Sequence, residues 1–385
     1  MGGYRGRRGV SRTILYVSGT RADFGLMRSS LLAIAADPAL SLSVVVTGMH
    51  LDPLYGETWQ EIAASGLAIA ARVPVTMDPP TGATMARALG HMTAAFVDAI
   101  EQAAPDIVLV LGDRGEMLAA AIAAIHLNIP VAHIHGGERS GTVDESVRHA
   151  ITKLSHIHFA ATEGARNRLI ALGERADCVF VTGAPGLDGL TDTAPADRRA
   201  VFGPMGFDLS RPIALLLFHP VLQEASAAAE KTRAVLDGVR QTGWQSLALM
   251  PNADAGSQAI RAVYEAEAPA GMVTRVHLPR DTFVQVMAAA DAMVGNSSSG
   301  IIEAASFGTP VLNLGARQNL RERNANVIDL PEDATQIAAH LNRIAGAPRP
   351  APQNVYGDGK AGPRIARHLA QHPLGAALMN KVLVY

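Results

Sequence analysis

The chain is poor in several features that would each point to a particular class of protein. It has a single cysteine, Cys178, so no disulfide can form within it, which is typical of a reducing compartment. Aromatic residues make up only 4% of the sequence, which disfavours base-stacking surfaces for single-stranded nucleic acid. The formal net charge of −2 provides no basic field for nucleic acid or anionic lipid. We therefore expect neither a nucleic acid nor a membrane surface as a partner.

Long apolar runs are also missing. The most apolar helical pattern, from Met117 to Ile125, is too short to span a bilayer and is followed by polar residues and Pro130. Residues 1–12 are basic and rich in glycine but lack the apolar core of a signal peptide, so we expect a disordered lead-in. Together these observations predict a cytoplasmic protein with no membrane-spanning segment.

What the chain does contain is a regular alternation of short apolar runs and amphipathic helical patterns. Its 385 residues, 48% of them hydrophobic, are enough for two domains with separate cores. Strands are expected at residues 13–17, 43–47, 107–111, 131–135, 158–161, 213–218, 246–250, 273–276, 292–294 and 311–314. Nearly continuous apolar strands separated by helices are typical of parallel, doubly wound sheets. We therefore predict an α/β protein with two Rossmann-like domains that face one cleft.

Breaks in composition suggest where these domains begin and end. The stretch from Asp192 to Arg199 is polar and contains Pro195, which is typical of a boundary, and residues 346–363 are rich in proline and glycine. The predicted parts are a tail (1–12), a first domain (13–190), a second domain (191–363) and a C-terminal helix (364–385). We expect this last helix to pack back on the first domain.

Two turns between a strand and a helix are candidate phosphate sites. Gly-Thr-Arg-Ala-Asp-Phe-Gly at 19–25 opens the first helix, whose free N–H groups attract anions, and Arg21 adds a bidentate donor. The alternative is that Thr20 or Asp23 merely caps the helix. In the second half, Ser297-Ser298-Ser299-Gly300 precedes a helix expected at 301–307, and Glu303 in that helix could accept from ribose hydroxyls. Ser and Glu near a helix start also form ordinary caps.

Candidate acid–base residues follow three other strands. Asp113 and Arg114 come after the strand at 107–111, where a parallel sheet delivers residues to its ligand crevice, although Asp113 could instead cap the next helix. His219 ends the strand at 213–218, as a proton donor, a phosphate contact or an ordinary surface histidine. His133 and His135 share one face of their strand, but no third ligand stands at a fixed spacing, so we expect no metal site.

The segment from Thr142 to Leu154 reads as an amphipathic helix. Asp144 and Arg148 are four residues apart, as are Glu145 and His149, so each pair consists of neighbours on the helix surface. One interpretation is two surface ion pairs of little energetic value. The other places Asp144 at the start of the helix, close to His135 and Asp113 across the crevice.

Taken in order, these motifs resemble one enzyme family. Gly-Thr-Arg-Ala-Asp-Phe-Gly, Gly-Asp-Arg, His-Ile-His-Gly-Gly-Glu and Asp-Glu-Ser-Val-Arg-His-Ala are followed by Phe-His-Pro, Gly-Asn-Ser-Ser-Ser-Gly and Gly-Ala-Arg-Gln-Asn. The combination is similar to hydrolysing UDP-N-acetylglucosamine 2-epimerases, which begin sialic- and legionaminic-acid biosynthesis. The resemblance runs from about Thr13 to Leu330 and implies a glycosyltransferase-B-like fold, a UDP-sugar bound between the domains, no cofactor, and a homodimer or homotetramer.

The resemblance also implies roles for individual residues. The implied acid–base group is Asp113, Asp144 and His219, with Glu145 nearby and His135 on the preceding strand. The implied contacts to the nucleotide and sugar are Arg21, Asp23, Arg114, Glu138, Ser297, Ser298, Ser299, Gly300, Glu303 and Arg317. The expected reaction is elimination of UDP followed by addition of water, which releases UDP and a free 2-epimeric sugar of the N-acetylmannosamine type. The sugar, either N-acetylglucosamine or a 2,4-diacetamido-trideoxy relative, and the base, UDP or GDP, remain open.

Some positions depart from parts of this family. Non-hydrolysing members and the animal hydrolysing enzyme have a glutamate where this chain has His135, so either a carboxylate or an imidazole could take the proton. Non-hydrolysing members also have Gln-His-Arg and His-Arg-Arg-Glu where this chain has Met49-His50-Leu51 and His219-Pro220-Val221, which argues against a reversible epimerase. A glycosyltransferase of the same architecture, a nucleotide-sugar sensor and a metal-dependent hydrolase are the competing interpretations.

Overall fold

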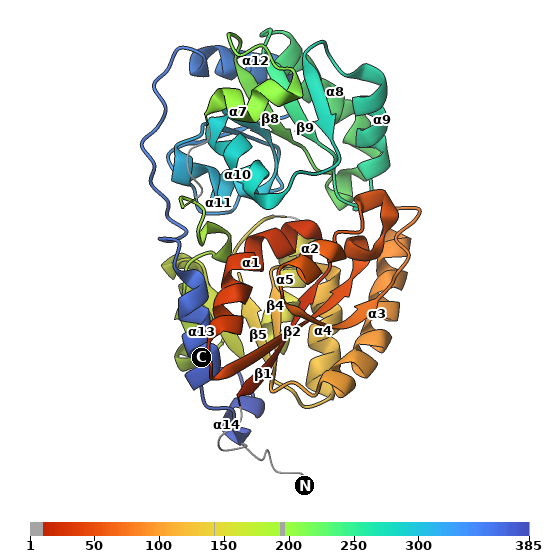
Figure 1. The fold of residues 1–385 in the computed structure, drawn as a ribbon, viewed down its shortest axis with the longest axis vertical. Helices are drawn as coiled ribbons and strands as arrows, with labels where there is room; N and C mark the ends of the chain where they lie inside the picture. Colours follow the sequence, from red (N-terminus) through yellow and green to blue (C-terminus); the bar gives the residue numbers. More distant parts are fainter. Residues whose placement is uncertain (1–10, 142, 193–196, 385) are drawn as a thin grey trace.

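Two parallel sheets form the framework of the molecule, one above the other in Figure 1. The computed structural model describes residues 11–141, 143–192 and 197–384, so most of the expected N-terminal tail lies outside the described residues. The sheets have the strand orders β3-β2-β1-β4-β5-β6-β7 and β10-β9-β8-β11-β12-β13. All pairings between neighbouring strands are parallel, which confirms the predicted fold class.

The elements alternate along the chain as strand and helix. The first sheet contains β1 (Arg12–Ser18), β2 (Leu40–Thr47), β3 (Ala68–Val73), β4 (Ile107–Leu111), β5 (Val131–Ile134), β6 (Ile157–Ala160) and β7 (Val179–Val181). The second contains β8 (Ile213–Leu217), β9 (Gln245–Leu249), β10 (Met272–Arg275), β11 (Ala292–Gly295), β12 (Val311–Leu314) and β13 (Val327–Leu330). The helices are α1 (Arg21–Ala36), α2 (Trp59–Ala64), α3 (Gly82–Ala103), α4 (Gly115–His126), α5 (Val143–Leu154), α6 (Glu163–Ala171), α7 (Arg198–Phe202), α8 (Ala228–Arg240), α9 (Ser257–Glu267), α10 (Arg280–Ala289), α11 (Ser298–Ile302), α12 (Ala334–Ile344), α13 (Ala361–Gln371) and α14 (Ala376–Met379).

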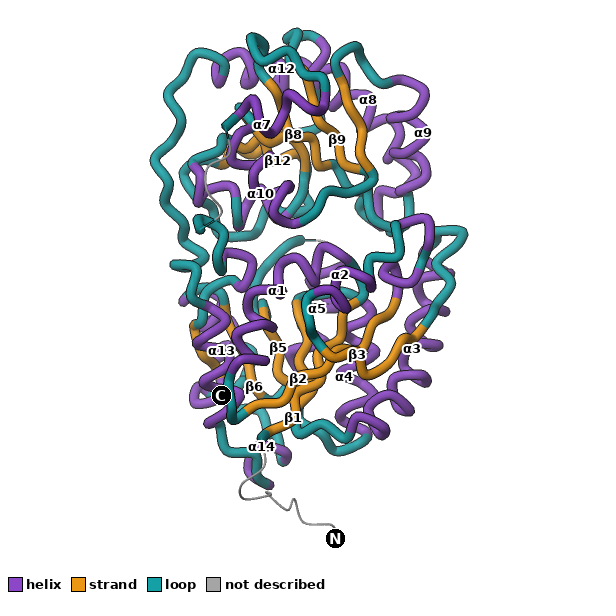
Figure 2. The backbone as a smooth tube through the Cα atoms, viewed as in Figure 1, coloured by secondary structure: helices purple, strands orange, loops and turns teal. Residues whose placement is uncertain are grey.

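Helices cover both faces of each sheet, as Figure 2 shows. In β1, Ile14 and Tyr16 pack with α1 and α13 on one face, whereas Leu15 and Val17 pack with α3 and α4 on the other. Each central strand is therefore buried on both sides, which explains its unbroken apolar sequence. None of the helices formed by the described residues has the length and apolar character needed to cross a membrane.

Three strands were not expected from the sequence, and all three lie at sheet edges. They are β3 and β7 in the first sheet and β13 in the second. An edge strand contacts fewer neighbours, and β13 has the burial pattern of a strand whose first three residues are partly or fully exposed. Its sequence therefore lacks the continuous apolar run that marked the central strands. Edge position, rather than a different fold, accounts for these misses.

The end of the chain crosses back from the second sheet to the first. Residues 345–360 run along the outside of the molecule to α13, which packs against α1 (Figure 1). The carboxylate of Asp188 accepts hydrogen bonds from the Ala361 and Gly362 N–H groups at the start of α13 and from Ser30 Oγ of α1. One partly buried carboxylate thus joins the first domain, its outgoing linker and the returning helix.

The docking of α13 leads to a stability prediction. A Cβ at Gly362 would lie 2.7 Å from Ser30 Cα and 2.9 Å from Asp188 Oδ2. We expect Gly362→Ala to lower the free energy of unfolding by about 1–3 kcal/mol, the usual effect of overpacking. Urea denaturation measures this change. Gly90→Ala is a matched control. Gly90 is exposed in α3, and a Cβ built there would meet no atom beyond its own helix backbone and chain neighbours within 4 Å, so the substitution should stabilise the fold by up to about 1 kcal/mol. Equal effects of both substitutions would contradict tight docking.

A buried glutamate fixes the last residues of the chain to the first domain. Glu174 Oε1 accepts a hydrogen bond from Lys153 Nζ at 2.6 Å, and Oε2 lies 2.9 Å from His158 Nε2 and 2.6 Å from Lys381 Nζ. Burial raises the pKa of Glu174, but these three donors outweigh it and bring the pKa down to about 2. The ionised carboxylate therefore stabilises the folded chain.

This depressed pKa predicts a pH dependence of stability. Because an unfolded glutamate titrates near pH ~4.3, the stabilisation is fully present above about pH 5 and is lost as the pH falls towards 2. Its size is about 3 kcal/mol. The difference in free energy of unfolding between the natural chain and Glu174→Gln should shrink across this range, as measured by urea denaturation at each pH. A difference that stays constant with pH would overturn the assignment.

Candidate active site

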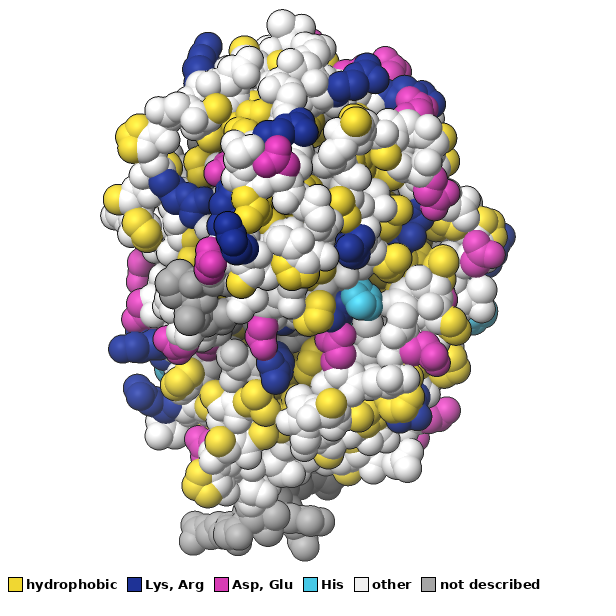
Figure 3. All heavy atoms as spheres, turned by 45° about the horizontal axis from the view of Figure 1, so that its top comes forward, with side chains coloured by type: hydrophobic (Ala, Val, Ile, Leu, Met, Phe, Trp, Pro, Cys, Tyr) yellow, Lys and Arg dark blue, Asp and Glu magenta, His cyan; other side chains and the backbone are white. Residues whose placement is uncertain are grey.

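A cavity of about 530 Å³ lies between the two sheets, at the carboxyl ends of their strands. From the first domain it is lined by the start of α1 and by residues after β2. From the second it is lined by residues after β8, β9, β10 and β11. The cavity has the size typical of small-ligand pockets and the position expected for parallel α/β sheets. The space-filling view in Figure 3 shows acidic, basic and histidine side chains gathered around the belt between the domains.

The turn after β1 contains the predicted helix cap and also presents Arg21 to the cavity. Thr20 is the N-cap of α1 and forms a capping box with Asp23, while Arg21 lines the cavity. Arg21 pairs with Glu61 of α2 at 2.6 Å, and its buried Nη1 has no hydrogen-bond partner among the described residues. A buried guanidinium nitrogen without an acceptor is suited to binding an anion from a ligand.

Asp23 does not reach the cavity. Its carboxylate is 5% exposed and accepts from the N–H groups of Gly19 at 3.0 Å and Thr20 at 2.6 Å and from Ser18 Oγ. These donors occupy the carboxylate inside the turn, so Asp23, a predicted ligand contact, does not line the cavity. Asp23 instead holds the turn in the shape that presents Arg21.

The serine-rich turn after β11 also faces the cavity. Ser297, Ser298 and Ser299 line it, and Ser297 caps the short helix α11. The helix expected at 301–307 starts earlier, at Ser298, and gives way after Glu303 to a 3₁₀ turn. Gly300 serves packing and not ligand contact, since a Cβ there would lie 2.9 Å from Val311 Cγ1. The turn therefore offers hydroxyl and N–H donors to one wall of the cavity.

Glu303 lies at the inner end of the same wall. Its side chain is 2% exposed and forms an ion pair with Arg280 of α10. Burial raises the pKa of Glu303, and Arg280 opposes that rise. Arg280 also donates to the Gly186 carbonyl at 2.8 Å, and it was not foreseen because a single arginine at a helix start carries no distinctive pattern. The pair leaves a buried carboxylate in reach of a ligand in the cavity.

His219 is fixed by an adjacent asparagine. Its N–H donates to Asn296 Oδ1 and its carbonyl accepts from Asn296 Nδ2, both at 2.8 Å, so the ends of β8 and β11 are locked together. Burial and then the charge of Arg317 lower the pKa of His219 to about 3, which keeps the imidazole neutral. Its Nδ1 is buried without a hydrogen-bond partner among the described residues. This ring lines the cavity and is free to exchange a hydrogen bond with a ligand.

Asp113 is bound by arginines and does not cap the next helix. The N-cap of α4 is Arg114, whereas the Asp113 carboxylate pairs with Arg148 and lies 4.0 Å from Arg321. Burial raises the pKa of Asp113, but Arg148 and Arg321 outweigh burial and lower it. The expected surface pair between Asp144 and Arg148 is therefore wrong, because Arg148 is fully buried and points at Asp113.

Asp144 has the opposite electrostatic setting. Its side chain is 35% exposed, and its oxygen lies 3.8 Å from Arg317 of the second domain. Burial and the nearby negative charge of Asp113 raise the pKa of Asp144. Two neighbouring carboxyl groups whose pKa values are displaced in opposite directions can divide acid–base work between them.

Glu145 is committed to the backbone. It accepts hydrogen bonds from the N–H groups of Ser140 at 2.9 Å and Gly141 at 2.7 Å, and lies 3.4 Å from His149. Burial raises the pKa of Glu145, but these contacts outweigh it and lower the pKa. The structure thus gives Glu145 a role in shaping the loop before α5, not a free carboxylate.

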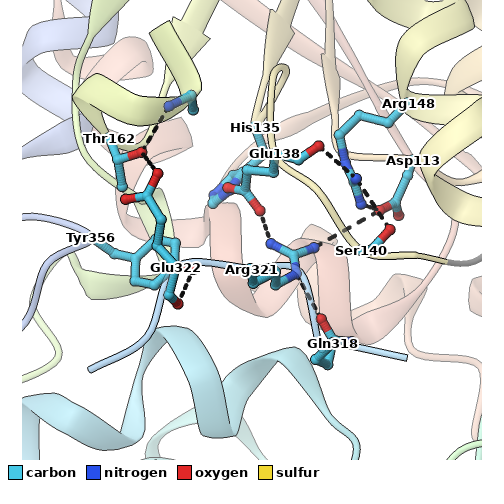
Figure 4. A network of polar contacts seen from close by, with 12 residues as sticks. Asp113, His135, Glu138, Ser140, Arg148, Thr162, Gln318, Arg321, Glu322 and Tyr356 are labelled. Carbon is cyan, nitrogen blue, oxygen red and sulfur yellow. Dashed lines mark hydrogen bonds and ion pairs between the residues drawn. The ribbon is translucent and has the colours of Figure 1, made fainter. Parts of the chain in front are cut away.

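The two histidines of β5 and its end differ in setting. His133 is buried in the core, with Nε2 2.7 Å from the Gly112 carbonyl. His135 has a left-handed backbone with φ of 64°, and its Nδ1 contacts Glu138. Burial and then Arg321 lower the pKa of His135 to about 3. Glu138 in turn pairs with Arg321 (Figure 4), so the glutamate expected to contact the ligand is turned towards protein groups. The described residues contain no cluster of side chains that could hold a metal.

Two clusters of candidate residues therefore lie next to each other, and only one of them lines the cavity. His219, Arg21, the three serines and Glu303 line the cavity, whereas Asp113, Asp144 and His135 do not. Arg317 connects the two clusters, since it donates to the Asn296 carbonyl at 3.1 Å and also reaches Asp144. Arg114 lies outside the lining and pairs with Asp254 of the second domain at 3.5 Å.

Known proteins resemble the chain along nearly its whole length. A protein of Legionella pneumophila named UDP-N,N′-diacetylbacillosamine 2-epimerase (hydrolyzing) is 47% identical over 97% of this chain and 100% of its own. A Campylobacter jejuni protein named GDP/UDP-N,N′-diacetylbacillosamine 2-epimerase (hydrolyzing) is 32% identical over 83% of this chain and 84% of its own.

Solved structures support the fold. The crystal structure of UDP-GlcNAc 2-epimerase from Neisseria meningitidis bound to UDP-GlcNAc has a TM-score of 0.79 with 20% identity and covers 94% of this chain and 100% of that one. Residues 32–370 also match the family described as UDP-N-acetylglucosamine 2-epimerase. The match over most of the chain, together with the full-length relatives, shows that this protein belongs to the UDP-N-acetylglucosamine 2-epimerase family.

Proposed function

We propose that the protein is a hydrolysing 2-epimerase that converts a UDP-2-acetamido sugar into UDP and the free 2-epimeric sugar. The observation that carries this proposal is the 47% identity, over 97% of this chain and the whole of the relative, to a protein named as a hydrolysing enzyme. We further propose that it acts in the cytoplasm as a homodimer or homotetramer and supplies sialic- or legionaminic-acid biosynthesis, as the sequence motifs imply.

UDP-N,N′-diacetylbacillosamine is the substrate that the relatives favour. Both hydrolysing relatives are named for this sugar nucleotide, and the more similar one is named for UDP alone. A relative from Neisseria meningitidis named UDP-N-acetylglucosamine 2-epimerase is 33% identical, which is less than the 47% of the Legionella protein. We therefore propose the diacetamido sugar before N-acetylglucosamine.

The cavity suits the nucleotide end of such a substrate. We propose that Arg21, the turn of Ser298 and Ser299, and Arg317 neutralise the diphosphate, and that Glu303 accepts from the ribose hydroxyls. The unpaired Nη1 of Arg21 and the donors of the serine turn support this assignment. Charge that develops on the departing diphosphate would be stabilised by groups already in place.

The reaction requires a proton to be removed from a carbon that is not acidic by itself. Loss of the proton from sugar carbon 2 becomes feasible when the bond from carbon 1 to the diphosphate oxygen breaks in the same or a coupled step. The products are UDP and a sugar with a double bond between carbons 1 and 2. Water then adds its hydroxyl to carbon 1 while a proton returns to carbon 2 from the opposite face.

Two groups are therefore needed, one for each proton transfer. We propose Asp144 for one transfer, because burial and the neighbouring charge of Asp113 raise its pKa above the ordinary value of a carboxyl group. We propose His135 for the other. Ionised Glu138 can only accept, so the His135 tautomer with hydrogen on Nδ1 leaves Nε2 as the base. We propose that His219 acts on the diphosphate of UDP as it leaves sugar carbon 1.

This mechanism fixes where isotopes enter the products. In heavy water, the freed sugar should carry one deuterium at carbon 2, because the returning proton comes from solvent. In heavy-oxygen water, UDP should carry no label, because the carbon–oxygen bond breaks and not the phosphorus–oxygen bond. Mass spectrometry of products from UDP-N,N′-diacetylbacillosamine without an acceptor tests both points. Labelled UDP, or an epimeric UDP-sugar in place of free sugar, would refute the proposal.

Asp144→Asn tests the acid–base assignment. We expect kcat to fall by roughly 10²–10⁴, the usual contribution of a general acid or base, with a much smaller change in KM. Glu145→Gln is the control on the same helix turn, since a glutamine oxygen can still accept from Ser140 and Gly141. Its loss should stay below about tenfold. Comparable losses for the two variants would contradict the separate roles, as steady-state UDP release would reveal.

A further inference from the structure

One arginine of the second domain reaches into the acid–base cluster of the first. Arg321 lies between β12 and β13, and its side chain is 8% exposed. It forms an ion pair with Glu138 and lies 4.0 Å from Asp113 (Figure 4). Arg321 does not line the cavity, so a direct contact with the nucleotide does not explain its burial.

The guanidinium is itself held in place from its own domain. Arg321 Nε donates to Gln318 Oε1 at 2.6 Å, and Gln318 Nε2 donates to the Asn296 carbonyl at 3.3 Å. Asn296 is the residue that fixes His219 and precedes the serine turn. A continuous set of polar contacts therefore runs from the proposed leaving-group site to Arg321.

On the other side, Arg321 determines what Glu138 can do. It engages Oε2 of Glu138, while Oε1 contacts His135 Nδ1. Glu138 is 3% exposed, so removal of the guanidinium would leave its carboxylate buried without the ion-pair partner of Oε2. An anchored carboxylate fixes both the orientation of a histidine ring and the nitrogen that carries hydrogen.

We propose that Arg321 is a positioning residue that orients His135 through Glu138 and steadies Asp113, so that the acid–base cluster is complete only when the two domains meet. This inference rests on the proposed hydrolysing epimerase function and extends it. The guanidinium comes from the domain that holds the diphosphate, whereas the groups it organises belong to the other. Proton transfer is thereby coupled to the domain arrangement that holds the nucleotide.

A second contact of the same loop provides a matched control. Glu322, next to Arg321, accepts from Thr162 Oγ1 at 2.9 Å and pairs with Arg168 at 3.0 Å, both in the first domain. This contact also joins the domains but touches neither His135 nor Asp113. Variants at Arg321 and Glu322 therefore distinguish an effect on the orientation of the cluster from an effect on the contact between the domains.

The test compares Arg321→Met, Arg321→Lys and Glu322→Gln in UDP release. Arg321→Met should lower kcat by 100-fold or more and change KM by less than about fivefold, because the cavity wall is intact. Arg321→Lys should recover part of kcat by restoring charge without the planar fork. Glu322→Gln should change kcat by less than about threefold. Equal losses in Arg321→Met and Glu322→Gln, or no loss in Arg321→Met, would overturn the proposal.

The pH profile gives a readout that a purely structural role would not move. Arg321 lowers the pKa of His135, so removing its charge raises that pKa, and the acidic limb of kcat/KM should move to higher pH. Histidine NMR should detect the same rise in the His135 titration without any turnover. If Arg321→Met does not fold, Arg321→Gln, which also removes the charge, carries both measurements. An unchanged His135 titration would overturn the inference alone, whereas no UDP release by the natural chain would overturn the proposed function.

Discussion

Pairing of buried carboxylates with arginines from the facing domain is the interaction on which the site depends. Glu138 and Asp113 are delivered by the first sheet, but Arg321 comes from the second. Asp144 likewise meets Arg317 across the gap. Glu138 is buried and would be costly to hold without a cation, and its cation comes from the opposite half of the chain, whereas Asp113 also pairs with Arg148 of its own domain. The electrostatics of the cluster are therefore a property of the assembled domains.

The parallel sheets explain why such pairs can form. All strands of a parallel sheet deliver their carboxyl ends to one edge, and here the two edges face each other. One edge carries Arg21 and the acid–base residues, and the other carries His219 and the serine turn. A reaction that couples departure of a diphosphate to proton transfer at the adjoining carbon needs two such walls. The returning helix α13 adds further packing to the first wall.

The candidate residues separate into those that face a ligand and those that support them. Arg21, His219, the three serines and Glu303 line the cavity, as the motifs suggested. Three residues of the same motifs, Asp23, Glu138 and Glu145, have carboxylates that bind backbone amides or neighbouring side chains. A sequence motif contains both the residues that face the ligand and the residues that hold them in place, because loss of either kind impairs the site.

The sequence by itself determined the two parallel α/β units, the central strands and the turns that carry the candidate site, since local periodicity and strand-end position encode them. It did not reveal β3, β7 and β13, three of the four edge strands, most of whose residues are partly or fully exposed. Nor did it indicate that Arg148 faces Asp113 and not Asp144, or that Arg321 and Arg280 complete the buried pairs. Those contacts join residues that are separated in the sequence, within one domain for Arg148 and Arg280 and between the domains for Arg321, so only the tertiary packing decided which charge neutralises which.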